Sequence, residues 1–166
     1  MFAREFADGT ITGLFALPVG RGQIALAKLI VYGLWATGVS VALAASLLVL
    51  GTLLGYGAPD ADALTGLGRQ VGLGVLTAAI VTPAAWVATA ARSLLAGVGA
   101  AIALVVITQV GVLAGAGAWM PPAAPAVWAM SGGVAAGPGP LGLAVVFALV
   151  FAALAARSWV RLQLNR

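Results

Sequence analysis

The chain has 166 residues, of which 63% are hydrophobic and 7% are charged, and its formal net charge is +4. A soluble domain carries about 25% charged residues because its surface faces water, so this composition excludes a soluble globule and predicts an integral membrane protein. Histidine and cysteine are absent, which excludes catalytic triads, Cys nucleophiles, imidazole or thiolate zinc sites and disulfides.

Residues 1–28 are predicted to form a cytoplasmic segment that leads into the first span. Phe2 and Phe6 lie four residues apart and so share one helix face, and Gly9 can end this helix. A second short apolar turn stops at Pro18, because the residue before a proline is biased away from helical backbone angles. The pattern predicts an amphipathic segment that either lies on the lipid surface or docks on a cytoplasmic partner.

Four apolar stretches then reach or approach the length of about 20 residues that a helix needs to cross a bilayer. They are residues 29–50, 71–91, 94–113 and 141–160, and a cytoplasmic tail follows at residues 161–166. None of them alternates like a barrel strand, so each is predicted to be a helix, with a kink at Pro83 in the second. The predicted fold is an all-α integral membrane protein whose transmembrane domain covers residues 29–160.

The distribution of charge predicts that both termini are cytoplasmic. Every cation except Arg69 lies before the first span, between the second and third spans, or at the end of the fourth. These positions share one side of the membrane, and the positive-inside rule makes that side the cytoplasm. The aromatic residues expected near the inner interface are Tyr32, Trp35, Trp86 and Trp159, and those near the outer interface are Tyr56, Trp119 and Trp128.

A cleaved signal peptide is the competing interpretation of the first span. Ala42-Leu43-Ala44 offers a small-x-small cleavage pattern. The apolar run continues beyond this point to Leu50, however, and the segment in front of the span is long and partly acidic. An uncleaved span is therefore expected.

The spans carry no ionisable residue near their middle, which disfavours proton-driven exporters and ion channels. Asp60 and Asp62 of the first outer loop supply too few oxygens for calcium and are expected to cap a helix or face solvent. Three Gly-x-x-x-Gly pairs have the spacing for close helix contacts, although a glycine-rich chain also produces this spacing by chance. They are Gly51 and Gly55, Gly68 and Gly72, and Gly111 and Gly115.

The N-terminal motif resembles the cytoplasmic loop of the permease subunits of type-2 ABC exporters. The matching positions are Glu5, Gly9, Thr10, Leu14, Pro18, Val19, Arg21 and Lys28, and Gly20 stands where that family usually has serine. The resemblance implies that residues 5–21 are a coupling segment, which docks on a separate ATP-binding subunit and transmits ATP-driven motion to the spans. It implies ATP and Mg in that partner and no cofactor in this chain.

The resemblance also implies what precedes the coupling segment, what lies before the last span and what the chain assembles with. In that family two spans precede the coupling loop, so this chain is expected to be a truncated reading frame or else a split or reduced permease. Residues 118–140 stand where the family has short re-entrant helices on the outer side, and they carry prolines and tryptophans but no charge. An ordinary interfacial loop is the alternative. A second permease copy, membrane lipid and a bacterial cytoplasmic membrane complete the implied setting.

The sequence therefore predicts the permease subunit of an ATP-driven exporter. The expected substrate is amphipathic or hydrophobic, such as a drug, a peptide or a lipid-like molecule, and it moves by alternating access. Lys28 is the sole lysine and follows Ala27, so the chain has no Gly-Lys-Ser/Thr motif and the ATPase must be a separate protein. Nucleic acid is not a predicted partner, because the cations are scattered. The alternatives are a non-transporting four-helix assembly or immunity partner and, more remotely, a membrane enzyme.

Overall fold

The computed structural model describes residue 13 and residues 18–161, and all regular structure within them is helical. Four helical segments are long and apolar enough to cross a membrane. They are α3 (Arg21–Leu53), the consecutive helices α4 (Ala61–Ile80) and α5 (Thr82–Ala91), α6 (Leu94–Leu113), and α8 (Pro138–Val160). The 3-10 helix η1 (Gly117–Trp119) and the short helix α7 (Ala124–Met130) lie between α6 and α8. The expectation of an all-α protein with four apolar spans is confirmed.

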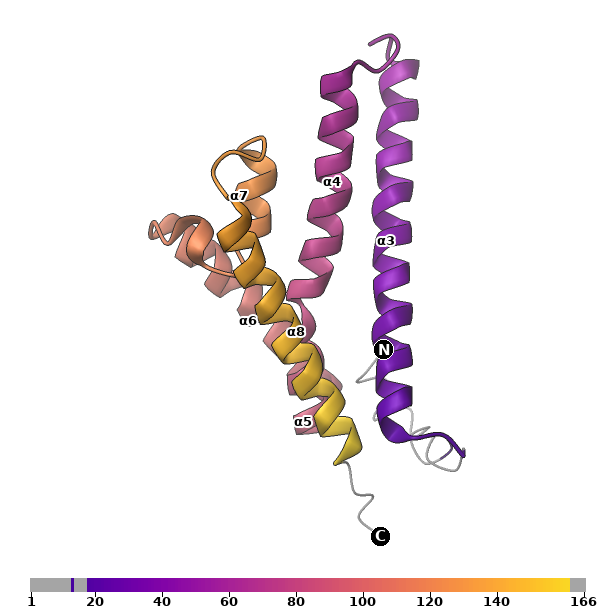
Figure 1. Ribbon diagram of the computed structural model, residues 1–166, viewed down its shortest axis with the longest axis vertical. Helices are drawn as coiled ribbons and strands as arrows, with labels where there is room; N and C mark the ends of the chain where they lie inside the picture. Colours follow the sequence, from indigo (N-terminus) through magenta and orange to yellow (C-terminus); the bar gives the residue numbers. More distant parts are fainter. Residues whose placement is uncertain (1–12, 14–17, 162–166) are drawn as a thin grey trace.

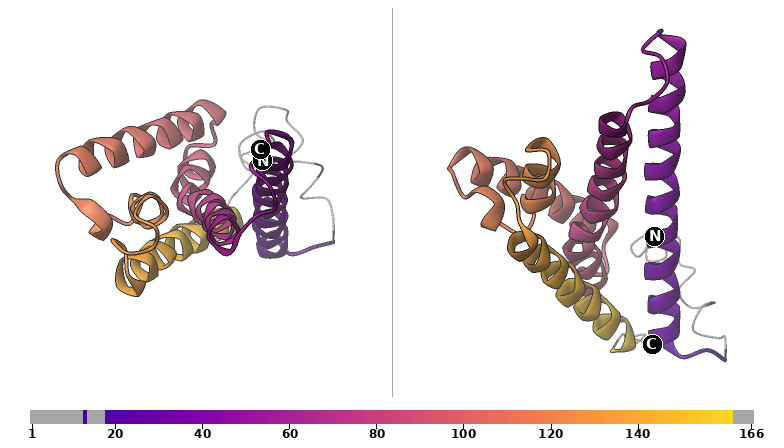
Figure 2. Two further views of the ribbon diagram at one scale, coloured as in Figure 1. Left: turned by 90° about the horizontal axis from the view of Figure 1, so that it is seen from above. Right: turned by 45° about the horizontal axis from the view of Figure 1, so that its top comes forward.

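The helices fall into two groups. Helices α3 and α4 run side by side as a long antiparallel pair, and α5 to α8 form a second group that leans away from the tip of this pair (Figures 1 and 2). In the second group α5 packs against α6 and α8, while α4 also touches α7 and α8. The groups meet again where α3 begins and α8 ends (Figure 1). Both described ends of the chain therefore lie at one end of the molecule.

The helices extend beyond the apolar stretches that hydropathy marks. Helix α3 begins at Arg21, inside the segment expected to be cytoplasmic. Helix α4 begins at Ala61, well before residue 71, because the Asp60 carboxylate caps it by accepting the Ala63 backbone N–H at 2.8 Å. The expected capping role of Asp60 is confirmed. Caps therefore set the ends of these helices, whereas hydropathy marks only their apolar middle.

A break at Val81 divides the second span into α4 and α5. Pro83 lies in the first turn of α5, where its missing N–H removes a helical hydrogen bond. The Val81 N–H donates to the carbonyl three residues back, Ala78, at 3.3 Å, and the Ala84 N–H donates to the Val81 carbonyl at 2.9 Å. The kink expected at Pro83 is confirmed.

The interior of the molecule is built from small side chains. Its buried hydrophobic residues are Ala25, Ala36, Ala84, Ala88, Ala118, Ala123, Ala124, Ala136, Ala144, Ala148 and Ala155, with Ile80 and Trp159. Large apolar side chains such as Leu95 and Leu113 face outward, with 82% and 87% of their surface exposed. This distribution is typical of helices in lipid. Small residues let the helix backbones approach closely, and large apolar side chains can face the lipid tails.

Two of the Gly-x-x-x-Gly pairs lie at the C-terminal ends of helices. Gly55 and Gly115 have φ angles of 85° and 84°, the left-handed conformation that terminates α3 and α6. In both cases the residue after this glycine donates its N–H to the first glycine of the pair, at 3.1 Å for Gly51 and 2.9 Å for Gly111. This is the Schellman motif, in which the residue after the left-handed glycine donates its N–H to a carbonyl five residues back. The accepting residue and the left-handed glycine therefore lie four positions apart, as in Gly-x-x-x-Gly. Gly51 and Gly55 make no close helix contact, since an added Cβ at either would meet nothing within 4 Å, which agrees with the alternative that their spacing arises by chance.

Candidate functional site

The predicted coupling residues fall on both sides of the boundary of the described chain. Glu5, Gly9, Thr10 and Leu14 lie outside the described residues, whereas Pro18, Val19, Arg21 and Lys28 lie within them. Gly20 precedes α3 in an extended conformation, and its N–H donates to the Gln23 side-chain oxygen at 3.2 Å. Arg21 is then the first residue of the helix. The last residue of the predicted coupling segment is therefore the first residue of a span, and a bend at residues 18–19 precedes it.

The base of α3 is joined to the end of α8 by Ala25, Lys28 and Trp159, here called the α3–α8 junction. Ala25 and Trp159 are fully buried in one cluster. The Lys28 ammonium nitrogen lies 4.5 Å from the centre of the Trp159 ring, a cation–π contact. Gly22 also faces the end of α8, since a Cβ there would be in ordinary van der Waals contact with a Val160 methyl group at 3.5 Å. Lys28 thus lies against another span, a contact that no sequence pattern indicated.

The turn between α5 and α6 is tight and backbone-strained. Arg92 adopts φ 51°, the one non-glycine residue with positive φ in the described chain, at a cost of about 1–2 kcal/mol. Ser93 then caps α6 by accepting the Ala96 N–H at 3.3 Å. Close packing of the two helices follows, because a Cβ on Gly97 would lie only 2.7 Å from that of Ala88.

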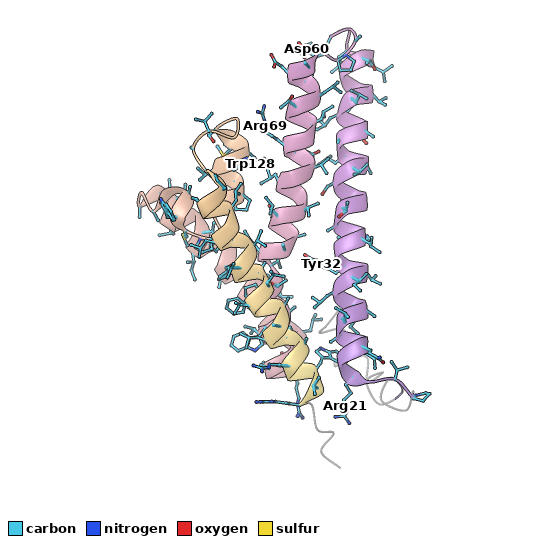
Figure 3. The ribbon with its side chains drawn as sticks, viewed as in Figure 1. Arg21, Tyr32, Asp60, Arg69 and Trp128 are labelled. Atoms are coloured by element: carbon cyan, nitrogen blue, oxygen red, sulfur yellow. The ribbon has the colours of Figure 1, made fainter. Side chains whose placement is uncertain are left out.

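Charge is segregated along the molecule. Arg21 marks the base of α3, whereas Asp60 and Arg69 lie in the opposite half, towards the tip of the α3–α4 pair (Figure 3). The other described cations are in the second turn of α3, in the α5–α6 turn and at the end of α8, and they are Lys28, Arg92, Arg157 and Arg161. One end of the helical bundle is therefore basic, as the sequence predicted from four crossings.

The segment between α6 and α8 folds back onto the other helices. The Arg69 guanidinium donates to the Gly132 carbonyl at 2.9 Å, which ties the end of α7 to α4. The Trp128 ring packs on Gly72, where a Cβ would lie 3.1 Å from it. Ala124 is fully buried beside Ile80, close to the break in the second span. Helix α7 thus lies below the tip of the α3–α4 pair (Figure 1), and its depth in a bilayer stays a prediction.

Two hydrogen bonds between helices flank the break at Val81. On one side the Tyr32 hydroxyl of α3 donates to the Ala78 carbonyl of α4 at 3.1 Å. On the other side the Thr82 hydroxyl of α5 donates to the Ala148 carbonyl of α8 at 3.0 Å. A membrane interior has no water to satisfy the carbonyls that a helix break releases, so the Tyr32 bond to Ala78 in the last turn of α4 stabilises the break. The Thr82 bond instead joins α5 to the unbroken helix α8.

The break therefore separates a helix bonded to α3 from a helix bonded to α8. A cavity of about 230 Å³ lies beside it, between α3, α5 and α6. Sequence reasoning assigned Tyr32 to the membrane interface and gave Thr82 no role, because no periodicity shows which helix a hydroxyl will meet. No group of three His, Cys, Asp or Glu side chains that could hold a metal ion occurs within the described part of the chain.

Comparison with known proteins gives one match. A family model described as ABC-2 family transporter protein matches residues 1–110, which include the predicted coupling segment, α3, α4, α5 and most of α6. No curated protein matches the chain, and no solved structure matches it.

Proposed function

We propose that this chain, which belongs to the ABC-2 transporter family, is the permease subunit of an ATP-driven exporter in a bacterial cytoplasmic membrane. A separate ATP-binding subunit, with its ATP and Mg, docks on residues 5–21 and supplies the energy. A second permease copy completes the path. The substrate is amphipathic or hydrophobic and crosses by alternating access, with both termini of the chain in the cytoplasm.

The observation that carries this proposal is that the predicted coupling segment, residues 5–21, ends on Arg21, the first residue of α3. Because α3 begins at Arg21, a force that the partner applies at Arg21 moves the helix as a whole. The α3–α8 junction passes that displacement to α8, since Trp159 is fully buried against α3 and lies beneath the Lys28 ammonium. A push at the cytoplasmic end thus reaches both groups of helices.

The break at Val81 supplies the second part of the mechanism. Helix α4 is hydrogen-bonded to α3, and α5 is hydrogen-bonded to α8. The two groups can then rotate against each other with Val81 as the pivot while both of these bonds persist. The contacts that have to yield are the Arg69 bond to Gly132 and the packing of Trp128 on Gly72. Rotation changes the opening between the groups, which is the motion that alternating access requires.

The test is co-purification of the full chain from its native membrane. A Walker-motif ATPase recovered in near-stoichiometric amount supports the proposal. Exchange of Glu5 and Arg21 for alanine is expected to weaken its retention about tenfold, equivalent to about 1.4 kcal/mol. Arg161→Ala is the matched control, because Arg161 is also an exposed cation near the same end but lies outside the segment.

The opposite results favour a different protein class. If the folded chain retains no ATPase, it is a non-transporting assembly partner, and the N-terminal segment is a lipid-surface anchor. If the Glu5 and Arg21 exchange leaves ATPase retention at the wild-type level, docking takes place elsewhere.

A further inference from the structure

One face of α8 is exposed along the second half of the helix. Residues three or four apart share a helix face, and every such position from Val146 to Arg161 is exposed. The apolar members have between 50% and 63% of their surface exposed. This α8 lipid face consists of Val146, Leu149, Val150, Arg157, Val160 and Arg161. Because α8 is one of the four candidate spans, the apolar part of the face meets the tails of lipids.

The same face becomes cationic where α8 ends. Arg157 lies in the last turn of the helix and Arg161 directly follows it. The two are four residues apart, so their side chains are neighbours, with about 5–6 Å between the Cβ atoms. The apolar stem of an arginine can lie along a helix in lipid while its head reaches the interface. Each guanidinium can then present a fork of N–H donors, which matches the geometry of a phosphate group.

Helix α5 contributes a third cation at the same depth. The rings of Trp86 in α5 and Phe151 in α8 lie 5.6 Å apart between centroids, and the hydroxyl of Thr82, one turn earlier in α5, bonds to α8 one turn earlier as well. The two helices therefore run in the same direction. Arg92 and Arg157 each follow their aromatic residue by six positions, about 9 Å of helix. The packing of α5 on α8 thus places the two arginines at one level.

The described residues carry no carboxylate at this end to complement the three cations. Their acidic side chains are Asp60 and Asp62, where α4 begins, and Asp60 lies in the opposite half of the molecule (Figure 3). An anionic partner of positive charge at the end of a span is a lipid headgroup or an acidic protein surface. Only a lipid also covers the apolar part of the face, because a protein in the water phase does not reach Val146.

We propose that the α8 lipid face binds an anionic phospholipid. The phosphate accepts hydrogen bonds from the guanidinium groups of Arg157 and Arg161, and one acyl chain lies along Val150, Leu149 and Val146. The net negative charge of the head selects it over a zwitterionic lipid, whose own cation the arginines repel. This inference goes beyond the proposed function, because the lipid is a bound component of the protein and not its cargo.

Fluorescence quenching of the full chain in lipid vesicles tests the location. The sequence has no cysteine, so Ala153→Cys places a single fluorophore on the exposed position one turn before Arg157. The vesicles are phosphatidylcholine with a minor share of either phosphatidylglycerol or phosphatidylcholine that carries brominated acyl chains, which quench on contact. Brominated phosphatidylglycerol is expected to bind more tightly at this reporter, by about fivefold for each arginine. Equal quenching by the two brominated lipids overturns the inference.

A second reporter separates this site from the general attraction of a cationic chain for anionic lipid. Val110 has 59% of its surface exposed and lies about 24 Å along α6 from Leu94, near the end remote from the arginines. A fluorophore on Val110→Cys is expected to be quenched equally by the two brominated lipids. The same preference at both reporters shows that anionic lipid gathers around the whole chain, and it overturns the site.

Charge variants test the recognition of the phosphate. Arg157→Gln and Arg161→Gln, each in the Ala153→Cys background, are expected to lower the preference for phosphatidylglycerol about fivefold. Arg157→Lys is the matched control, because it keeps the positive charge and is expected to keep most of the preference. Quenching by brominated phosphatidylcholine at the Val110 reporter shows that each variant is still inserted and folded. A preference that survives both glutamine exchanges overturns the inference.

The quenching needs no ATPase, so its failure is distinguishable from failure of the proposed function. Retained ATPase without a lipid preference leaves the permease assignment standing and removes the lipid site. A lipid preference in a chain that retains no ATPase confirms the lipid site and removes the exporter. If the two glutamine exchanges release the ATPase and leave the lipid preference unchanged, the arginines belong to a protein interface, and the inference is overturned.

Discussion

The pair formed by α3 and α4 and the pair formed by α5 and α8 are held together in different ways. Four of the ten residues of α5 are buried, against three of the 33 residues of α3. The α5–α8 pair also carries stacked aromatic rings, with Phe151 centred 5.6 Å from Trp86 and 4.9 Å from Phe147. The α3–α4 pair instead has an open groove along its length. Dense packing makes α5 and α8 a stable scaffold, and sparse packing leaves α3 and α4 free to shift against it.

The largest expected effect comes from a bulky side chain in the scaffold group. Gly97→Leu forces α5 and α6 apart, because even a Cβ at this position lies 2.7 Å from that of Ala88. We expect a loss of about 3 kcal/mol of stability, the upper range for overpacking. Gly99→Leu is the control, since a Cβ there meets nothing within 4 Å. Thermal unfolding in detergent measures both, and similar melting temperatures would show that the scaffold is not densely packed.

Removal of the two hydroxyls beside the break compares the groups directly. Thr82→Val removes a buried hydrogen bond of the scaffold and is expected to cost about 1.5 kcal/mol, near the maximum for such bonds in membranes. Tyr32→Phe removes a half-buried bond of the α3–α4 pair and is expected to cost about 0.6 kcal/mol. Denaturant titration of both variants and the double variant gives the values. A larger cost for Tyr32→Phe contradicts the assignment of scaffold and mobile pair.

The α5–α6 turn is expected to respond in the opposite direction. Arg92→Gly relieves the left-handed conformation of Arg92 and should raise stability by about 1 kcal/mol. Arg92→Ala removes the same charge without relieving the backbone, so it separates strain from electrostatics. Unfolding in detergent compares the two. Equal stabilities would mean that the φ of 51° is not costly here.

The smallest expected effect concerns the α3–α8 junction. Lys28→Met keeps the length of the side chain and removes the charge over the Trp159 ring, so we expect a loss of about 0.5 kcal/mol. A double-mutant cycle with Trp159→Leu isolates the pair, because neighbouring residues fail to add when they interact. A coupling energy of zero would leave the junction held by burial alone.

The fold was largely predictable from the sequence because its dominant signal is hydropathy. Apolar stretches located the four crossings, and Pro83 marked the break. The ends of the helices were less predictable, since a cap such as Asp60 extends α4 into polar sequence. The pairs ending at Gly55 and Gly115 have a spacing that serves both helix contacts and helix caps, and only the backbone angles distinguish the two.

The candidate site was predictable only where it depends on a local motif. Lys28 was singled out from the resemblance, but its partner Trp159 was assigned to the inner interface, and it is fully buried because α3 covers it. The groove between α3 and α4 was not predictable, since hydropathy does not determine the register of the two helices that form it. Contacts of this kind depend on which faces of the helices meet.

The length of α3 has a mechanical consequence. Its 33 residues extend about 50 Å at 1.5 Å per residue, well over the hydrocarbon thickness of about 30 Å. In the proposed mechanism the ATPase acts on the base of this long helix, and the rest of the helix crosses the membrane. A tilt of a few degrees at the base moves the far tip by several ångströms, so in the proposed mechanism a small displacement at the ATPase-binding end gives a larger displacement at the opposite end.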